Sequence, residues 1–320
     1  MKAIRVQKFG EPDVLQIDDI PDLKAGPGQI VVRVHAAGVN PVETYIRSGK
    51  YAKLPDLPYT PGTDGAGLVA QVGPDVHGFR IGERVYLAGS LSGTYAEQAL
   101  CLPAHLHRLP GAISFAQGAA LGIPYATAHF ALFGRGKAHS GETVLIHGAT
   151  GGVGLAALQL ARSAGLTVFA TGGTEEGRAL LHREGAHHVF DHHAADYPAQ
   201  ILAATEGRGV NLILEMLANV NLGKDLPMLA VNGRVSVVGS RGPVEINPRD
   251  TMARNADIRG VMLTLAGPSV AADIHCALVA GLENASLHPI VAREYPLAEA
   301  AQAHTAIMEP GATGKLVLIP

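Results

Sequence analysis

The chain has 320 residues, of which 47% are apolar and 17% charged, and its formal net charge at pH 7 is −3. This composition excludes a disordered or collagen-like chain and indicates a folded α/β protein long enough for two domains. Acidic and basic residues are interspersed and no apolar run approaches membrane-spanning length, so the sequence does not favour nucleic-acid or membrane binding.

The first 122 residues are predicted to form a β-rich domain. Residues 1–6 read as an alternating strand and not as a targeting segment, so we expect a cytoplasmic protein. Pro-Gly, Gly-Pro and Asp-Pro pairs separate the short strands. The expected strands are 3–6, 15–18, 29–36, 66–72, 84–88 and 95–100. Between them, residues 38–63 are less regular and carry aromatic and amide side chains, which are typical of ligand-binding loops on a β scaffold.

From Gly118 the pattern changes to Ala-rich runs, with helical spacing over 119–133. We place a second domain at 123–268, where strands and helices alternate. The expected strands are 143–146, 166–170, 188–191, 211–216, 234–239 and 258–263, and the expected helices are 155–164, 175–184, 195–205 and 222–230. This alternation predicts a doubly wound parallel sheet of the Rossmann type, whose strand carboxyl ends form the ligand crevice.

The C-terminal residues 269–320 are predicted to return to the β-rich domain and complete it. Two helical stretches, 269–282 and 297–307, precede a final strand at 314–319. The β-rich half lacks a partner layer of its own, so we expect the tail to supply one.

Cysteine and histidine usage argues against a metal site. The two cysteines, Cys101 and Cys276, lie far apart in the sequence, which excludes a disulfide framework and a four-cysteine zinc site, and we expect both to be buried. The densest histidine group includes no mixed carboxylate or thiolate set, and we expect it to be a solvated surface group. Its members are His182, His187, His188, His192 and His193.

A glycine-rich turn carries the main functional signal. Residues 143–154 pass from an apolar strand through glycines directly into a helix, and a second strand follows, so the segment reads as one βαβ unit. Ala149 stands where the first glycine of a Gly-x-Gly-x-x-Gly fingerprint would be. The glycines let a diphosphate approach the backbone at the helix N-terminus. The alternative is a tight turn without a ligand.

The end of the second strand favours NADPH over NADH. NAD-preferring sites place an acid there to hold the ribose hydroxyls, whereas this chain has the neutral residues 171–174. Arg178 is the nearest cation that could pair with the 2′-phosphate, although it could equally be a solvated helix residue. We therefore expect NADPH as the cofactor.

Several segments closely resemble the zeta-crystallin-type NADPH:quinone oxidoreductases, a zinc-free family of the medium-chain dehydrogenase/reductase superfamily. They are 39–49, 58–62, 148–154, 173–177, 215–221, 237–242 and 245–252. The resemblance spans nearly the whole chain and implies a GroES-like β-rich catalytic domain and a Rossmann domain, with the cofactor between them. Zinc enzymes of that superfamily place Cys after a Gly-Val pair and His in a Gly-His-Glu stretch. Here Asn40 follows Gly38-Val39, and residues 61–65 read Pro-Gly-Thr-Asp-Gly, so we expect no metal.

The resemblance implies that Tyr45 contacts the nicotinamide side of the cofactor, and Tyr45 and Asn40 are the candidate catalytic residues, as hydrogen-bond donors to a quinone oxygen. The expected cofactor-binding residues, Arg178 included, are Tyr45, Thr127, Thr150, Gly151, Gly152, Val153, Gly173, Arg178, His192, Asn221, Val238, Gly239, Ser240, Arg241, Val261, Met262 and Leu263. Three have structural alternatives: Tyr45 as a loop aromatic, His192 as a surface histidine, and 261–263 as sheet core.

The function that follows is zinc-independent transfer of reducing equivalents from NADPH to a small-molecule quinone. A second enzymatic hypothesis is reduction of an enone double bond, which needs a proton donor at the α carbon. A third is a nucleotide-dependent RNA-binding or structural protein, against which the charge of −3 argues. The resemblance also implies a homodimer or homotetramer paired through the 258–263 edge.

Overall fold

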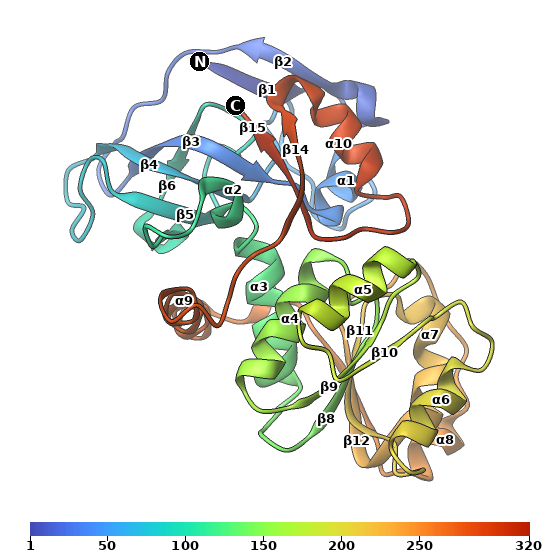
Figure 1. Cartoon of the computed structure of the whole chain (residues 1–320). Coiled ribbons are helices and arrows are strands. Elements are labelled where there is room, and N and C mark those ends of the chain that lie inside the picture. Colours follow the sequence, from blue (N-terminus) through green and yellow to red (C-terminus); the bar gives the residue numbers. More distant parts are fainter. The chain divides into compact units, whose positions relative to one another are not determined.

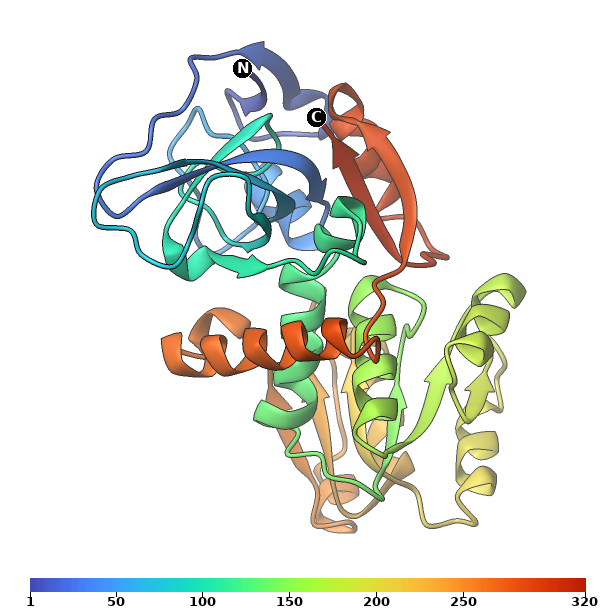
Figure 2. The same ribbon diagram turned by 60° about the vertical axis from the view of Figure 1, so that its left-hand side comes forward.

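The computed structural model describes all 320 residues and divides them into two compact units. One, which we call the β-rich unit, contains Met1–Ile123 and His275–Pro320, and the other, the parallel-sheet unit, contains Pro124–Ile274. Both are visible in Figures 1 and 2. The chain returns to the β-rich unit between Ile274 and His275, which lies inside helix α9 (Pro268–Glu283). The boundary predicted from the sequence lies between 268 and 269, at the start of that helix.

The β-rich unit contains a seven-stranded sheet in the order β14-β15-β3-β4-β5-β7, with β6 paired to β3, and a separate β1-β2 pair. Its strands are β1 (Lys2–Val6), β2 (Leu15–Asp19), β3 (Ile30–Gly38), β4 (Asp64–Val72), β5 (Arg84–Ala88), β6 (Gln98–Cys101), β7 (Leu106–Arg108), β14 (Val291–Pro296) and β15 (Lys315–Ile319). Its short helices are α1 (Pro41–Arg47), α2 (Phe115–Gly118) and α10 (Ala300–Ala306), with 3₁₀ turns at Pro12–Val14, Pro103–His105 and Leu297–Glu299.

The C-terminal strand β15 lies antiparallel to β3, with Val317 opposite Gly38, so the tail is part of this sheet. Buried side chains from both ends of the chain, among them Ile4, Val32 and Leu318, share one core. The tail and the N-terminal strands therefore stabilise one another by apolar burial.

Helix α1 lies inside the segment that the sequence indicates to be irregular. The Asn-Pro pair at 40–41 begins this helix: Asn40 is the N-cap, Pro41 occupies the first helical position, and the Glu43 carboxylate accepts the Asn40 N–H at 2.8 Å. The strand expected at 95–100 is also shorter, because only Gln98–Cys101 pairs with β3.

The parallel-sheet unit has six parallel strands in the order β10-β9-β8-β11-β12-β13. They are β8 (Thr143–Ile146), β9 (Thr167–Thr171), β10 (His188–Phe190), β11 (Val210–Glu215), β12 (Leu229–Val237) and β13 (Asp257–Gly260). The helices are α3 (Gly122–His129) with a π-helical extension (Phe130–Arg135), α4 (Gly152–Ser163), α5 (Glu175–Arg183), α6 (Tyr197–Ala204), α7 (Ala218–Asp225) and α8 (Pro248–Met252), with 3₁₀ turns at Leu226–Met228 and Leu263–Leu265.

The strand order confirms the doubly wound sheet. From β8 the chain proceeds to β9 and β10 on one side and later to β11, β12 and β13 on the other, so β8 and β11 flank the topological switch point. Fully buried Leu145 and Ile213 from these two strands belong to the core of this unit. The expected helix over 222–230 is wrong at its end, since α7 stops at Asp225 and Leu229 already belongs to β12. Pro227, which has no N–H to donate, follows this stop.

No helix in the structure combines the length and the apolar character needed to cross a membrane. Cys101 is buried as expected, but the expectation for Cys276 is wrong, because that thiol is exposed on α9. Both cysteines are unpaired.

Candidate nucleotide and substrate sites

The turn after β8 leaves open space in front of a helix. Gly148 has a φ of +55°, and α4 starts with Gly151 as an N-cap that provides no side-chain hydrogen bond. A Cβ added to Gly151 would meet only the Gly148 carbonyl oxygen, at 3.6 Å. At Gly154, by contrast, a Cβ would come within 2.5 Å of the Ala149 Cα, so the helix packs against the turn only with glycine there. An uncapped, open helix N-terminus of this kind suits a diphosphate.

The glycine turn is hydrogen-bonded to Thr171, the last residue of β9. The Ala149 N–H donates to the Thr171 carbonyl at 3.0 Å, and the Gly148 N–H donates to Thr171 Oγ1 at 3.2 Å. The residues expected at the diphosphate lie at the head of α4, where Thr150 is buried and Gly151, Gly152 and Val153 are half-buried.

Gly173, Arg178 and His192 lie together beside the end of β9. A Cβ at Gly173 would stand 2.7 Å from Nε2 of His192. Arg178 Nη1 donates to the Gly172 carbonyl at 3.3 Å and pairs with Asp191 Oδ2 at 2.9 Å. Arg178 is therefore held at the strand end by a carboxylate and is not a freely solvated helix residue. The expected surface histidines, His182, His187, His188, His192 and His193, are all exposed.

The remaining residues expected at the cofactor follow β11, β12 and β13. The N–H groups of Val238 and Gly239 donate to the Glu215 carbonyl, at 2.8 and 3.2 Å. Asn221 Nδ2 donates to Glu215 Oε1 at 3.2 Å. Ser240 and Arg241 are exposed.

Residues 261–263 are not sheet core. The Val261 N–H still donates to the Val237 carbonyl at 2.9 Å, but β13 ends at Gly260 and the Met262 side chain is 49% exposed. The alternative of sheet core is therefore wrong for this segment, and the expected strand over 258–263 is shorter than predicted.

Sequence reasoning missed a buried cluster at the switch point. His147 follows β8, Glu215 ends β11 and Asp225 ends α7, and the latter two are fully buried. His147 Nε2 lies 2.8 Å from Asp225 Oδ1 and 3.7 Å from Glu215 Oε2. A charged residue closing the apolar run Leu-Ile-Leu-Glu was the only local signal, because the three residues meet only through the order of the strands.

The environment of this cluster favours bound protons. Burial lowers the pKa of His147, but the adjacent Asp225 carboxylate opposes it, and the net effect is a raised pKa. Burial raises the pKa of the Glu215 carboxyl to about 7, against the attraction of His147. The imidazole therefore carries its charge more readily than usual, and Glu215 carries its charge less readily.

In the β-rich unit, a cavity of about 360 Å³ lies beside α1. Its lining includes Glu43 and Ile46 from α1, Tyr59 and Pro61 from the following loop, and Ser90. Glu43 is buried and accepts hydrogen bonds from the Thr63 N–H at 3.1 Å and from Tyr95 Oη at 2.7 Å. Burial raises the pKa of Glu43, although the nearby Lys315 ammonium opposes the shift.

Asn40, Asp64 and Lys315 form a buried polar cluster behind this cavity wall. Asn40 Nδ2 donates to Asp64 Oδ2 at 2.9 Å, and the Lys315 ammonium donates to the same oxygen at 3.0 Å and to Asn40 Oδ1. The other Asp64 oxygen accepts the Ile123 N–H at 2.7 Å. Asn40 and the 61–65 stretch are the segments that correspond to zinc-ligand positions in the zinc enzymes of the superfamily. Here Asn40 and Asp64 both bind the Lys315 ammonium, which β15 provides. Nothing in the local sequence indicated Lys315.

The structure does not bring every predicted residue to these places. Tyr45 is half-buried on α1 but does not line the 360 Å³ cavity, and Thr127 is half-buried on α3 in the parallel-sheet unit. Asn40 is only 2% exposed. Their roles toward cofactor and substrate stay predictions.

Comparison with known proteins shows the family to which this fold belongs. The model of the alcohol dehydrogenase GroES-like domain matches residues 26–111, and that of the zinc-binding dehydrogenases matches residues 152–278. Human quinone oxidoreductase is 48% identical over 321 aligned residues, covering 100% of this chain and 98% of the relative, and the mouse protein is 49% identical over 323 residues with the same coverage. The crystal structure of Escherichia coli quinone oxidoreductase complexed with NADPH superposes with a TM-score of 0.88 at 28% identity, over 100% of both chains.

Proposed function

Because this chain belongs to the quinone oxidoreductase family of the medium-chain dehydrogenase/reductase superfamily, we propose that it is an enzyme that transfers reducing equivalents from NADPH to quinones. One observation of this structure carries the proposal: the open, uncapped N-terminus of α4 at the switch point of a doubly wound sheet. A helix start that has glycine at its N-cap and no side-chain cap suits a diphosphate.

The residues present fit NADPH along the carboxyl edge of the parallel sheet. Residues 150–153 hold the diphosphate, Gly173 and the His192 ring that packs against it lie beside the adenosine, and Arg178 pairs with the 2′-phosphate. Asn221, residues 238–241 and residues 261–263 line the edge after β11, β12 and β13, with Thr127 and Tyr45 as further contacts. When bound, NADPH supplies a hydride equivalent from its dihydronicotinamide ring.

The cavity beside α1 is the quinone site in this proposal. Ile46, Pro61 and the Tyr59 ring provide apolar surface for a flat ring. Quinones are strong electrophiles, so the protein mainly orients the ring and excludes water. Both amide protons of Asn40 are already donated, to Asp64 at 2.9 Å and to Glu43 at 3.3 Å, so we assign Asn40 to positioning α1. Tyr45 lies on the same helix but outside the cavity lining, and we keep it as the candidate donor to a quinone oxygen that projects beyond the cavity.

We propose that the reaction needs no zinc. A zinc ion needs ligand atoms whose lone pairs are free to bind it. Here the lysine ammonium already occupies the oxygens of Asn40 and Asp64. An ammonium held by these two side chains already provides the positive charge that the buried Asp64 carboxylate needs.

Two further proposals concern the setting of the enzyme. β13 is the edge strand of its sheet and carries a 40% exposed Ile258, which supports pairing of two sheets in a homodimer or homotetramer. Two unpaired cysteines are consistent with a reducing compartment, the cytoplasm. Light scattering during size-exclusion chromatography measures the oligomer, and a monomer at micromolar concentration would contradict the first of these proposals.

The test of function is oxidation of NADPH and of NADH, after treatment with a chelator, in the presence of small and large quinones and of an enone. We expect quinone-dependent oxidation that prefers NADPH and survives chelation. Activity with the enone alone would establish the double-bond reductase instead. No oxidation with any quinone would refute the proposal, and activity lost on chelation would refute its zinc-free form.

A further inference from the structure

The cluster of His147, Glu215 and Asp225 lies where the two nucleotide-binding loops leave the sheet. β8 and β11 are adjacent parallel strands, and their carboxyl ends lead into the glycine turn and into α7. His147 is the residue that precedes Gly148, and Glu215 is the last residue of β11. A change of charge here therefore acts on both loops at their origin.

Each member of the cluster is connected to backbone that the proposed cofactor would touch. His147 Nδ1 lies 3.5 Å from Thr171 Oγ1, which accepts the Gly148 N–H. The Glu215 carboxylate accepts the Leu217 N–H and the Asn221 amide, and the Glu215 carbonyl accepts the N–H of Val238. Glu215 thus links the loop after β11 to the loop after β12.

The cluster is short of positive charge. Two carboxylates share one imidazole, and neither Glu215 Oε2 nor Asp225 Oδ2 has a hydrogen-bond partner. The two carboxyl groups interact directly, and a proton on Glu215 can be donated to Asp225. Two buried carboxylates that share one imidazole repel each other when both are ionised, and a proton on one of them relieves that repulsion.

No other side chain around the cluster supplies that charge. The Tyr197 ring from α6 stands edge-on to His147, with ring centroids 6.3 Å apart, and burial raises the pKa of its hydroxyl to about 12. Lys224 on α7 is exposed, and it and His192 act on His147 only through space. Thr171 from β9 is neutral.

We propose that His147, Asp225 and Glu215 form a positioning cluster for the nucleotide loops, and that loss of the Glu215 proton that bonds to Asp225 weakens NADPH binding. The inference rests on the proposed function. With the proton in place, Glu215 holds its loop and bonds to Asp225. Without it, the two carboxylates repel each other, and α7 and the loop after β11 move apart.

Direct binding to the unliganded protein tests this, by calorimetry between about pH 6 and about pH 8.5. NADPH is compared with NADH, which lacks the titrating 2′-phosphate. For wild type we expect the dissociation constants of both nucleotides to rise about fivefold or more across this range. Glu215→Gln mimics the protonated acid, since its amide can donate to Asp225, so its affinity stays near the low-pH value of wild type at every pH.

Two further variants complete the design. Glu142→Gln removes a buried carboxylate at the opposite end of the same sheet and is the control for lost stability. We expect its nucleotide affinity to change with pH as in wild type. Asp225→Asn removes the step as Glu215→Gln does. Thermal unfolding of each variant without nucleotide confirms that it is folded and reports the same titration independently of binding.

A wild-type protein that binds NADPH equally at all pH values would overturn the inference alone, as would a step that persists in Glu215→Gln. A metal ion that binds wild type stoichiometrically and is lost in Asp225→Asn would also overturn the inference. The cluster would then be balanced by a cation and not by a proton. A wild-type protein that binds neither nucleotide at any pH would refute the proposed function, and the inference with it.

Discussion

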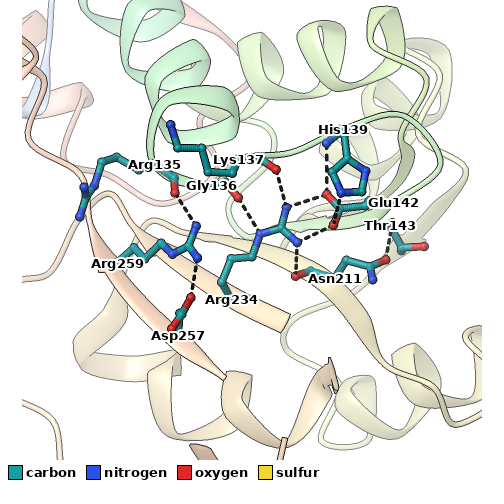
Figure 3. Close-up of polar contacts among 10 residues, drawn as sticks. All are labelled: Arg135, Gly136, Lys137, His139, Glu142, Thr143, Asn211, Arg234, Asp257 and Arg259. Carbon is teal, nitrogen blue, oxygen red and sulfur yellow. Dashed lines mark hydrogen bonds and ion pairs between the residues drawn. The ribbon is translucent and has the colours of Figure 1, made fainter. Parts of the chain in front are cut away.

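The parallel sheet holds a buried cluster of charges at each end, and the two clusters satisfy their charges differently. At the amino end, Arg234 donates to both oxygens of Glu142, each at 2.6 Å, and to the carbonyls of Gly136, Lys137 and Asn211. Figure 3 shows this guanidinium enclosed by its acceptors. At the carboxyl end, two carboxylates share one imidazole and leave two oxygens without partners.

We therefore assign the paired cluster at the amino end to stability, and the unbalanced cluster at the carboxyl end to ligand binding. A fully paired ion pair fixes one arrangement of its loops, and no ligand is needed to complete it. A cluster that lacks a proton or a counter-charge responds to pH and to what binds nearby. In open α/β sheets the ligand binds at the carboxyl end, which is the end with the unbalanced cluster here.

The largest effect is expected at the amino end. Arg234→Met leaves the Glu142 carboxylate buried without a partner and lowers the free energy of unfolding by about 3 to 5 kcal/mol, measured by denaturant unfolding. The matched control is Arg259→Met, whose pair with Asp257 is more exposed and contributes less than about 1 kcal/mol. Equal losses in the two variants would contradict the role given to Arg234.

The two ends should also respond to pH in opposite directions. Burial raises the pKa of Glu142, but the hydrogen bonds from Arg234 lower it more, and the net pKa lies below the ordinary 4.5, so its contribution to stability is present above that value and is lost on acidification. Glu215 has its pKa raised from 4.5 to about 7, and that of His147 is raised above 6.5, so both lose stabilisation as pH increases.

Glu215→Gln therefore removes a cost that builds up in wild type as pH rises from 4.5 to about 7 and is present in full above that. At about pH 8 we expect the variant to exceed wild type by about 2 kcal/mol in unfolding free energy, with the advantage gone at about pH 5. Chemical unfolding at several pH values measures this. A variant less stable than wild type at both pH values would show that the charged carboxylate is needed and would remove the contrast between the two ends.

A smaller effect is expected for nucleotide choice. Arg178→Gln removes the cation at the end of β9 and should raise KM for NADPH about tenfold while leaving KM for NADH unchanged. Asp191→Asn is the matched opposite, because it releases Arg178 from its 2.9 Å ion pair and should strengthen the preference for NADPH. If Arg178→Gln changed both KM values equally, Arg178 would not read the 2′-phosphate.

The smallest effect is expected outside both clusters, at Tyr45. Tyr45→Phe removes the hydrogen bond that we propose to the quinone oxygen and should lower turnover about threefold to tenfold, with KM for NADPH little changed. Steady-state kinetics with one quinone suffices to measure it. A loss beyond about a thousandfold would instead identify Tyr45 as an obligatory proton donor.

Much of the parallel-sheet unit could be predicted because its signals are local. The strand, glycine turn and helix over 143–163 lie in one short stretch, and the alternation that follows fixes a parallel sheet. Helix α1 was missed since Asn40-Pro41 indicates a turn as readily as a helix start. The end of α7 was misplaced because Leu-Ala-Val at 229–231 is compatible with either helix or strand.

The polar clusters could not be predicted, because their members are distant in sequence. Asp225 reaches His147 across 78 residues, and Lys315 reaches Asn40 across 275. Each of these side chains looks like an ordinary charged residue until the strand order places it. The exposure of Cys276 has the same origin, since it depends on which side of α9 is covered.

The place of Lys315 has a consequence for how the chain is made. Asp64 is fully buried, and its cationic partner Lys315 belongs to β15, 251 residues further along the chain. The β-rich unit is assembled from Met1–Ile123 and His275–Pro320, whereas the parallel-sheet unit is one continuous stretch. During synthesis the first half of the β-rich unit must therefore wait, with a carboxylate still in need of its counter-ion, while an entire second unit emerges between its two parts.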